Sequence, residues 1–131
     1  MKRTGLLHAE LSEIIARLGH GDLLVIGDAG LPIPDGPRRV DLAVSAGVPR
    51  FDDVLAAVLG EMQVESAVVA AELAARNPAV DAQIRRRLAA VPIACTPHED
   101  FKGLTRSARA MVRTGECSPY ANVILRAGVV F

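Results

Sequence analysis

Apolar residues recur at helical spacing in residues 10–19. They stand at offsets of three, one and three, which places them on one face of a helix. Gly19 follows at the position where glycine commonly ends a helix. Three more segments combine apolar spacing with helix start signals, so we expect further helices at residues 51–62, 77–91 and 96–112.

Two of these predicted helices carry clear signals at their amino ends. Asn77 is a suitable cap, and Pro78 stands at the first helical position, where a missing N–H is not needed. Thr96, Pro97 and Glu99 form the pattern of a capping box, in which two side chains satisfy backbone N–H groups. We therefore expect the last helix to begin after Thr96 and to be long.

Apolar runs of strand length separate the helices. The run LLVIG, residues 23–27, has no polar alternation, which is typical of a strand buried on both faces. Three prolines and a glycine in LPIPDGPRR, residues 31–39, indicate a loop after it. Further strands are expected at residues 40–45, 64–73, 92–96 and 123–131, with a loop at residues 113–122.

The alternation of strands and helices favours an α/β fold, a layered structure with a mainly parallel sheet flanked by helices. Since no linker or internal repeat interrupts the pattern, we expect a single domain over residues 1–131. Sheets of this class bind ligands beyond the carboxyl ends of their strands. Asp28 and His98 each follow a predicted strand, so both are expected at that edge.

Composition narrows the classes of function. Half of the 131 residues are hydrophobic, aromatic residues make up only 3%, and 15 basic residues balance 15 acidic ones. A neutral chain with few aromatics is a poor candidate for nucleic-acid binding. Low net charge with high apolar content instead favours self-association.

The expected location of the protein in the cell rests on features that the sequence lacks. No apolar run is long enough to span a membrane, and glutamates and a histidine stand where a signal peptide would be apolar. Cys95 and Cys117 form no CxxC pattern, so neither a disulfide framework nor a zinc site is expected. We expect a cytoplasmic protein with reduced thiols, no metal, and neither a membrane nor a nucleic acid as partner.

Two histidines are candidates for proton transfer. His20 follows the carboxyl end of a predicted helix, where the helix dipole favours imidazolium. His98 is the second residue of another predicted helix, where the dipole disfavours it. Environments that push two proton affinities apart suit an acid and base pair. The alternative for His20 is a turn residue beside a glycine.

Four more polar residues are candidate ligands of a substrate. Asp28 is either a buried carboxylate that needs partners or the start of an Asx turn. Lys102 lies four residues after His98 on the same helix face, or is simply exposed. Tyr120 and Asn122 share one face of an extended segment, where a phenol and an amide suit sugar hydroxyls. The alternative is a loop tyrosine with a capping asparagine.

Several segments together resemble the D-ribose pyranase family, which belongs with the fucose mutarotases. In order, they are GHGD, DAGLPIP, VDLAVSAGVP, GEMQVESAVVAAE, TPHEDFK and GECSPYANVIL. The likeness runs from the LGH at residues 18–20 to the last phenylalanine. The DAGLP form points to the ribose branch rather than the fucose branch.

The resemblance implies an enzyme that interconverts the pyranose and furanose forms of D-ribose without a cofactor. The proton-donating histidine of the family matches His20. The family's sugar-binding positions match Asp28, His98, Tyr120 and Asn122, and Lys102 also lines such sites. Family members form pentameric rings stacked as decamers, with sites near subunit contacts, so a homo-oligomer is expected.

Proton transfers alone account for such a reaction. Ring opening needs a base at the anomeric hydroxyl and an acid at the ring oxygen, and a different hydroxyl then closes on the rotated aldehyde. We assign the acid role to His20, while Asp28 orients His20 or binds a hydroxyl. His98 and Lys102 hold hydroxyls, with His98 a candidate base, and the Tyr-Ala-Asn segment orients the sugar.

Other functions stay open on the sequence. One is a mutarotase that acts on fucose or a related sugar. Another is a non-catalytic sugar-binding subunit of a ribose uptake system, in which the same side chains bind sugar without moving protons. A purely structural assembly role would explain the apolar tail VVF, but not the convergence of polar side chains.

Overall fold

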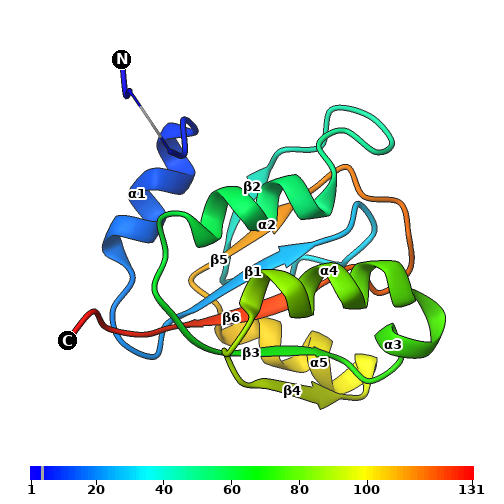
Figure 1. Ribbon diagram of the computed structural model, residues 1–131. Helices are drawn as coiled ribbons and strands as arrows, with labels where there is room; N and C mark the ends of the chain where they lie inside the picture. Colours follow the sequence, from blue (N-terminus) through cyan, green and yellow to red (C-terminus); the bar gives the residue numbers. More distant parts are fainter. Residues whose placement is uncertain (4) are drawn as a thin grey trace.

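The computed structural model describes residues 1–3 and 5–131, and its strands form one six-stranded sheet (Figure 1). The strands are β1 Leu23–Gly27, β2 Arg38–Asp41, β3 Val64–Ala70, β4 Ile93–Thr96, β5 Ala110–Arg113 and β6 Val123–Ala127. Their order in the sheet is β2-β5-β1-β6-β3-β4. β6 runs antiparallel to β1 and β3, and the other three pairings are parallel. The expected α/β fold with a mainly parallel sheet is confirmed.

Helices cover both faces of this sheet. They are α1 Ala9–Arg17, α2 Phe51–Leu59, α3 Leu73–Arg76, α4 Pro78–Leu88 and α5 His98–Leu104, followed by the 3-10 turn Thr105–Ser107. α1, α2 and α4 pack on one face, over a core that includes Leu24 and Ile26 of β1. On the other face, Phe101 of α5 and Val25 of β1 belong to a second, smaller core. Successive strand residues point to opposite faces, and β1 is buried on both. Its sequence therefore has no polar alternation. Within residues 1–3 and 5–131, none of the helices has the length and apolar character needed to cross a membrane.

The expectation of one long helix over residues 96–112 was wrong. α5 ends at Leu104, and the segment Ala110–Arg113 is strand β5, which lies between β1 and β2. Ala110, Met111 and Val112 are all buried, because β5 is covered on both faces. A short apolar run without alternation fits a buried strand and a buried helix segment equally well, so its pattern did not decide between them.

The capping box expected at the start of α5 was also wrong. Thr96 is the last residue of β4 and pairs with Ala70, so it is not the cap. Pro97 occupies the cap position, and His98 is the first helical residue rather than the second. The carboxylate of Glu72 accepts a hydrogen bond from the His98 backbone N–H at 3.1 Å. Glu72, which is distant in sequence, therefore accepts the backbone hydrogen bond at the start of α5 that was expected of Thr96.

The start of α4 agrees with its prediction, and the end of α1 differs from its prediction by two residues. α4 begins as expected, because Pro78 is its first residue and Asn77 Oδ1 accepts from the Val80 N–H at 3.4 Å. α1 ends at Arg17 rather than at Gly19, since its next residue is already extended. His20 therefore lies beyond the last turn of α1, in a tight connection to β1.

The remaining strands differ from expectation only at their ends. β2 begins two residues earlier than residues 40–45 and ends at Asp41. β3 ends at Ala70, and the rest of the segment 64–73 turns into α3. As expected, the carboxyl ends of β1, β3 and β4 lie along one edge, since β6 is antiparallel to both β1 and β3.

Candidate active site

A pocket of about 180 Å³ lies at this edge, beyond the carboxyl ends of β1 and β4. We call it the polar pocket. Its lining residues come from four separate segments and are Asp28, Gly30, Leu31, Pro32, Arg76, His98, Pro119, Tyr120 and Asn122. The structure thus brings together four of the six predicted site residues.

Asp28 follows β1 directly and plays both of the roles considered for it. Its Oδ1 accepts the Gly30 N–H at 2.9 Å, which is the Asx turn. Its own backbone N–H donates to Asn122 Oδ1 at 2.8 Å. Burial raises the pKa of the Asp28 carboxyl, and the hydrogen bond from Gly30 only partly opposes this. Such a carboxylate is easier to protonate than an exposed one.

Asn122 lies at the centre of the arrangement, just before β6. Its side chain reaches the end of β1, and the residue is only 1% exposed. A Cβ on Gly27 would lie 3.0 Å from Asn122 Oδ1 and 2.7 Å from a methyl carbon of Leu31. A glycine at the end of β1 therefore makes room for the amide that binds Asp28.

His98 and Tyr120 line the same pocket from different elements. The His98 ring meets the Tyr120 ring edge-on, with centroids 5.1 Å apart. It also stacks on Phe101 at 6.2 Å, which belongs to the smaller core. Tyr120 has φ +57, a left-handed conformation that non-glycine residues seldom adopt. Its backbone is held there by the loop described next.

The loop before Tyr120 is tied to the amino ends of two helices. Asn77, the cap of α4, donates from Nδ2 to Ser118 Oγ at 2.9 Å and to the Pro119 carbonyl at 2.8 Å. Ser118 donates in turn to Glu116 Oε2 at 3.0 Å. The other oxygen of Glu116 accepts the first N–H of α2 at 3.2 Å. These bonds fix the position from which Tyr120 faces the pocket.

Two buried polar atoms of pocket-lining residues have no hydrogen-bond partner among the described residues. They are Nδ1 of His98 and Nδ2 of Asn122. Buried polar atoms are nearly always hydrogen-bonded in folded proteins, because an unpaired one loses its solvation without compensation. A ligand that carries several hydroxyls would supply both partners.

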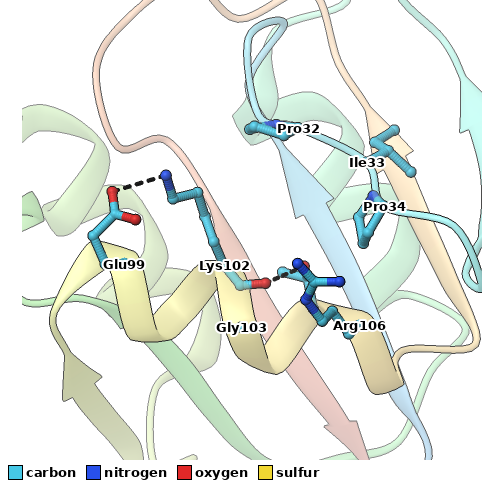
Figure 2. Close-up of a pocket in the computed structure, with 8 residues that line it drawn as sticks. Pro32, Ile33, Pro34, Glu99, Lys102, Gly103 and Arg106 are labelled. Atoms are coloured by element: carbon cyan, nitrogen blue, oxygen red, sulfur yellow. Dashed lines mark hydrogen bonds and ion pairs between the residues drawn. The ribbon is translucent and has the colours of Figure 1, made fainter.

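Lys102 does not line the polar pocket. It lines an adjoining cavity of about 460 Å³, which shares Pro32 with the polar pocket. Figure 2 shows its amino group directed at Glu99, and the two are 2.8 Å apart at Nζ and Oε1. Lys102 therefore faces the cavity next to the polar pocket, and its charge is paired with Glu99.

His20 lies at the opposite edge of the sheet. It precedes β1, whereas Asp28 follows it, and a five-residue strand spans roughly 17 Å. Its Nε2 lies 2.7 Å from Glu65 Oε2, and its side chain is 59% exposed. Within one chain, the His20 ring is therefore not part of the polar pocket.

Sequence reasoning missed Arg76, which also lines the pocket. It ends α3, and its guanidinium forms no ion pair or hydrogen bond with any residue that the structure describes. No motif marks Arg76, which ends α3 just before the capping Asn77, so the sequence offered no signal for its place in the pocket. Glu72, which holds the start of α5, could not be found from its spacing because 26 residues separate it from His98.

Comparisons with known proteins bear on this site. Residues 1–130 match the model of a family described as the RbsD / FucU transport protein family. The chain belongs to the RbsD / FucU family. A D-ribose pyranase of Paracidovorax citrulli is 62% identical over 133 residues, and one of Symbiobacterium thermophilum is 59% identical over 131 residues. Both alignments cover all of this chain and all of the relative.

Solved structures of RbsD / FucU proteins show the same fold. Bacillus subtilis RbsD, determined in complex with D-ribose, has a TM-score of 0.97 and 46% identity, with full coverage of both chains. A fucose mutarotase of Streptococcus pneumoniae, determined with L-fucose, has a TM-score of 0.79 and 27% identity over 95% of each chain. The resemblance drawn from the sequence segments is confirmed.

The chemistry that this RbsD / FucU site offers is hydrogen bonding and proton transfer. The polar pocket combines a carboxylate with a raised pKa, an imidazole, a phenol, an amide and a guanidinium. In the part of the chain that the structure describes, no three His, Cys, Asp or Glu side chains lie together as a metal site would require.

Proposed function

We propose that this protein interconverts the pyranose and furanose forms of D-ribose by general acid–base ring opening and reclosure. The observation that carries the proposal is the pair of unpartnered buried atoms, His98 Nδ1 and Asn122 Nδ2, in a pocket that also holds Asp28. Support comes from relatives named D-ribose pyranase at 59% and 62% identity, and from the ribose complex of Bacillus subtilis RbsD.

The pocket residues have distinct roles in this proposal. Tyr120 and Asn122 orient the sugar through its hydroxyls. The base that takes the anomeric proton is the His98 imidazole, while Asp28 binds an adjacent hydroxyl. The raised pKa of Asp28 lets its carboxyl accept a proton more readily than an exposed aspartate does. Lys102 holds a hydroxyl when it leaves Glu99.

The acid at the ring oxygen is His20, and we propose that a neighbouring copy of the chain supplies it. One chain holds His20 and the polar pocket at opposite edges of the sheet, so the two meet only across a contact between copies. The pentameric rings stacked as decamers that the resemblance implies would provide such contacts. We further propose that the protein works in the cytoplasm, without a cofactor.

Saturation-transfer NMR on the anomeric protons of D-ribose tests this function directly. The wild-type protein should accelerate exchange between pyranose and furanose signals, and Asp28→Asn should slow it by at least about tenfold. Asp53→Asn is the matched control, since it makes the same change at an exposed residue on α2, and it should exchange ribose at the wild-type rate.

Each rival function gives a different result in the same assay. Calorimetric ribose binding without any acceleration would identify a sugar-binding subunit and contradict the proposal. Faster exchange of L-fucose than of D-ribose would identify a fucose-type mutarotase and contradict the assigned substrate.

A further inference from the structure

Among the residues that the structure describes, Glu65 alone holds the His20 side chain. The His20 ring lies in the exposed connection between α1 and β1, and Glu65 Oε2 lies 2.7 Å from Nε2. A carboxylate only accepts hydrogen bonds, so this contact requires a proton on Nε2. Nδ1 is then the nitrogen left to exchange a proton with a substrate.

The backbone around Glu65 is shaped to place this carboxylate. Pairing between β3 and β6 changes register between Val64 and Ser66, which makes Glu65 the extra residue of a β-bulge. Bulges redirect a side chain relative to the regular strand. A Cβ on Gly128 would lie 3.1 Å from the Glu65 Cβ, so a glycine just after β6 permits the close approach of the chain at this point.

Arg126 holds the second oxygen of the same carboxylate. Its Nε donates to Glu65 Oε1 at 2.8 Å, while Oε2 binds His20. Gly21 brings the His20 turn close to this arginine, since a Cβ there would lie 3.2 Å from the guanidinium. Gly21 has φ +85, which suits glycine. The hydrogen bond from His20, followed by that from Arg126, lowers the pKa of Glu65, so the carboxylate stays ionised.

We propose that Glu65 is the positioning residue for His20, and that it holds Nε2–H so that Nδ1 exchanges protons with the sugar. This inference deepens the proposed function and rests on it. A carboxylate that fixes the tautomer and orientation of a catalytic imidazole is a recurring device in acid–base enzymes. Glu65 itself does not touch the substrate in this scheme.

The proton balance follows from this assignment. In ring opening, His20 begins with a proton on both ring nitrogens. The base removes the anomeric hydroxyl proton, C1=O forms, the bond from C1 to the ring oxygen breaks, and that oxygen takes the proton from Nδ1, which leaves the neutral Nε2–H ring. In ring closure, a different hydroxyl attacks C1 and gives its proton to Nδ1, and the carbonyl oxygen recovers a proton from the base. His20 and the base end as they began.

The hydrogen-bond directions make Glu65→Gln an unusual test. Arg126 only donates, so the glutamine carbonyl must face Arg126 and the NH2 group must face His20. Nε2 must then accept, so the ring holds a single proton, on Nδ1, and the doubly protonated form that donates to the sugar loses its acceptor at Nε2. Glu65→Ala removes the constraint and leaves both tautomers. Glu65→Gln should therefore lower kcat at least as much as Glu65→Ala, by at least about tenfold, whereas a merely structural glutamate would tolerate glutamine better.

Two readouts test the proposal. Nitrogen-15 NMR of histidine-labelled protein, with His20 assigned by His20→Gln among the three histidines, should show that the neutral His20 ring is the Nε2–H tautomer in the wild type and the Nδ1–H tautomer in Glu65→Gln. Calorimetry should show ribose affinity changed by less than about twofold, since the polar pocket is intact. Replacing Arg126 with alanine in the Glu65→Gln background frees the amide to turn, and should recover part of kcat.

Controls separate this inference from the function on which it rests. Glu61→Gln, at an exposed glutamate paired with Lys2, should change neither the tautomer nor kcat. An unchanged tautomer and kcat in Glu65→Gln, with an active wild type, would overturn the role of Glu65. An inactive wild type would instead overturn the proposed function. If Glu65→Gln does not fold, Glu65→Ala is measured in its place. A mixture of the Nε2–H and Nδ1–H tautomers of His20 would support the proposal, and an unchanged Nε2–H tautomer would overturn it.

Discussion

At the scale of single residues, several polar groups of the polar pocket lower the stability of the folded protein when no ligand is bound. His98 Nδ1 and Asn122 Nδ2 are buried without partners among the described residues, and Asp28 is a partly buried carboxylate whose pKa is raised. Each of these features costs free energy of folding in the absence of a ligand. Sites that bind polar substrates commonly carry such costs.

The substitution Asp28→Asn should therefore stabilise the folded protein at pH 7. The raised pKa means that the folded state binds the Asp28 proton more tightly than the unfolded state, whose pKa is near 3.8. The wild type thus loses stability as the pH rises from that value through the folded-state pKa. Asparagine keeps the Asx turn through its carbonyl oxygen and does not titrate.

Urea unfolding at several pH values measures this effect. The stability advantage of Asp28→Asn over the wild type should be largest at neutral pH and should shrink as the pH falls toward 3.8. An advantage that grows on acidification would show that the folded state favours the ionised carboxylate, contrary to the burial described above.

At the scale of elements, the loop that presents Tyr120 depends on Asn77. The side-chain oxygen of Asn77, Oδ1, caps α4, and the side-chain NH2 group donates to Ser118 Oγ and to the Pro119 carbonyl. One side chain thus has two separable tasks, which are the stability of a helix and the position of a loop that lines the pocket.

Two substitutions separate these tasks. Asn77→Asp keeps an oxygen for the cap but loses the NH2 donor, so it should weaken ribose binding while retaining most of the cap's stability. Asn77→Ala loses both, and should lower the free energy of unfolding by about 2 kcal/mol. Calorimetry of ribose binding and urea unfolding give the two quantities. Unchanged ribose affinity in Asn77→Asp would contradict the positioning role of this loop.

Elements were predictable from the sequence where the local pattern alone decides the structure. The run LLVIG and the Asn77–Pro78 start of α4 needed no distant contact, and both predictions are confirmed. β5 was missed because a buried apolar run of three residues, Ala110 to Val112, has no diagnostic period. The start of α5 was missed because Glu72, far away in sequence, replaces the local cap.

The candidate site was predictable only in part. Position beyond the strands placed Asp28 and His98 together, and the structure brings Tyr120 and Asn122 to them. Arg76 was missed because it carries no motif. The roles of these residues, and those of His20 and Lys102, stay predictions, since the arrangement of hydroxyls around a bound sugar is not encoded in spacing.

At the scale of the whole molecule, β1 separates the two halves of the proposed machinery. His20 and its Glu65 partner lie at the amino edge of the sheet, and the polar pocket lies at the carboxyl edge. No rotation of side chains bridges a strand of this length. If His20 acts as proposed, a complete site requires a second copy of the chain, and the neutral, apolar composition is compatible with such self-association.

Mixed assemblies of two inactive variants test this claim most directly. His20→Ala and Asp28→Asn, each inactive alone, are co-expressed with different tags, and the assemblies that carry both tags are isolated for the ribose exchange assay. If each site takes His20 from one copy and Asp28 from another, random mixing restores both residues in about a quarter of the sites, and a matching share of wild-type activity returns. If both residues act within one chain, every chain carries a defect, and mixed assemblies as inactive as either variant would contradict the account.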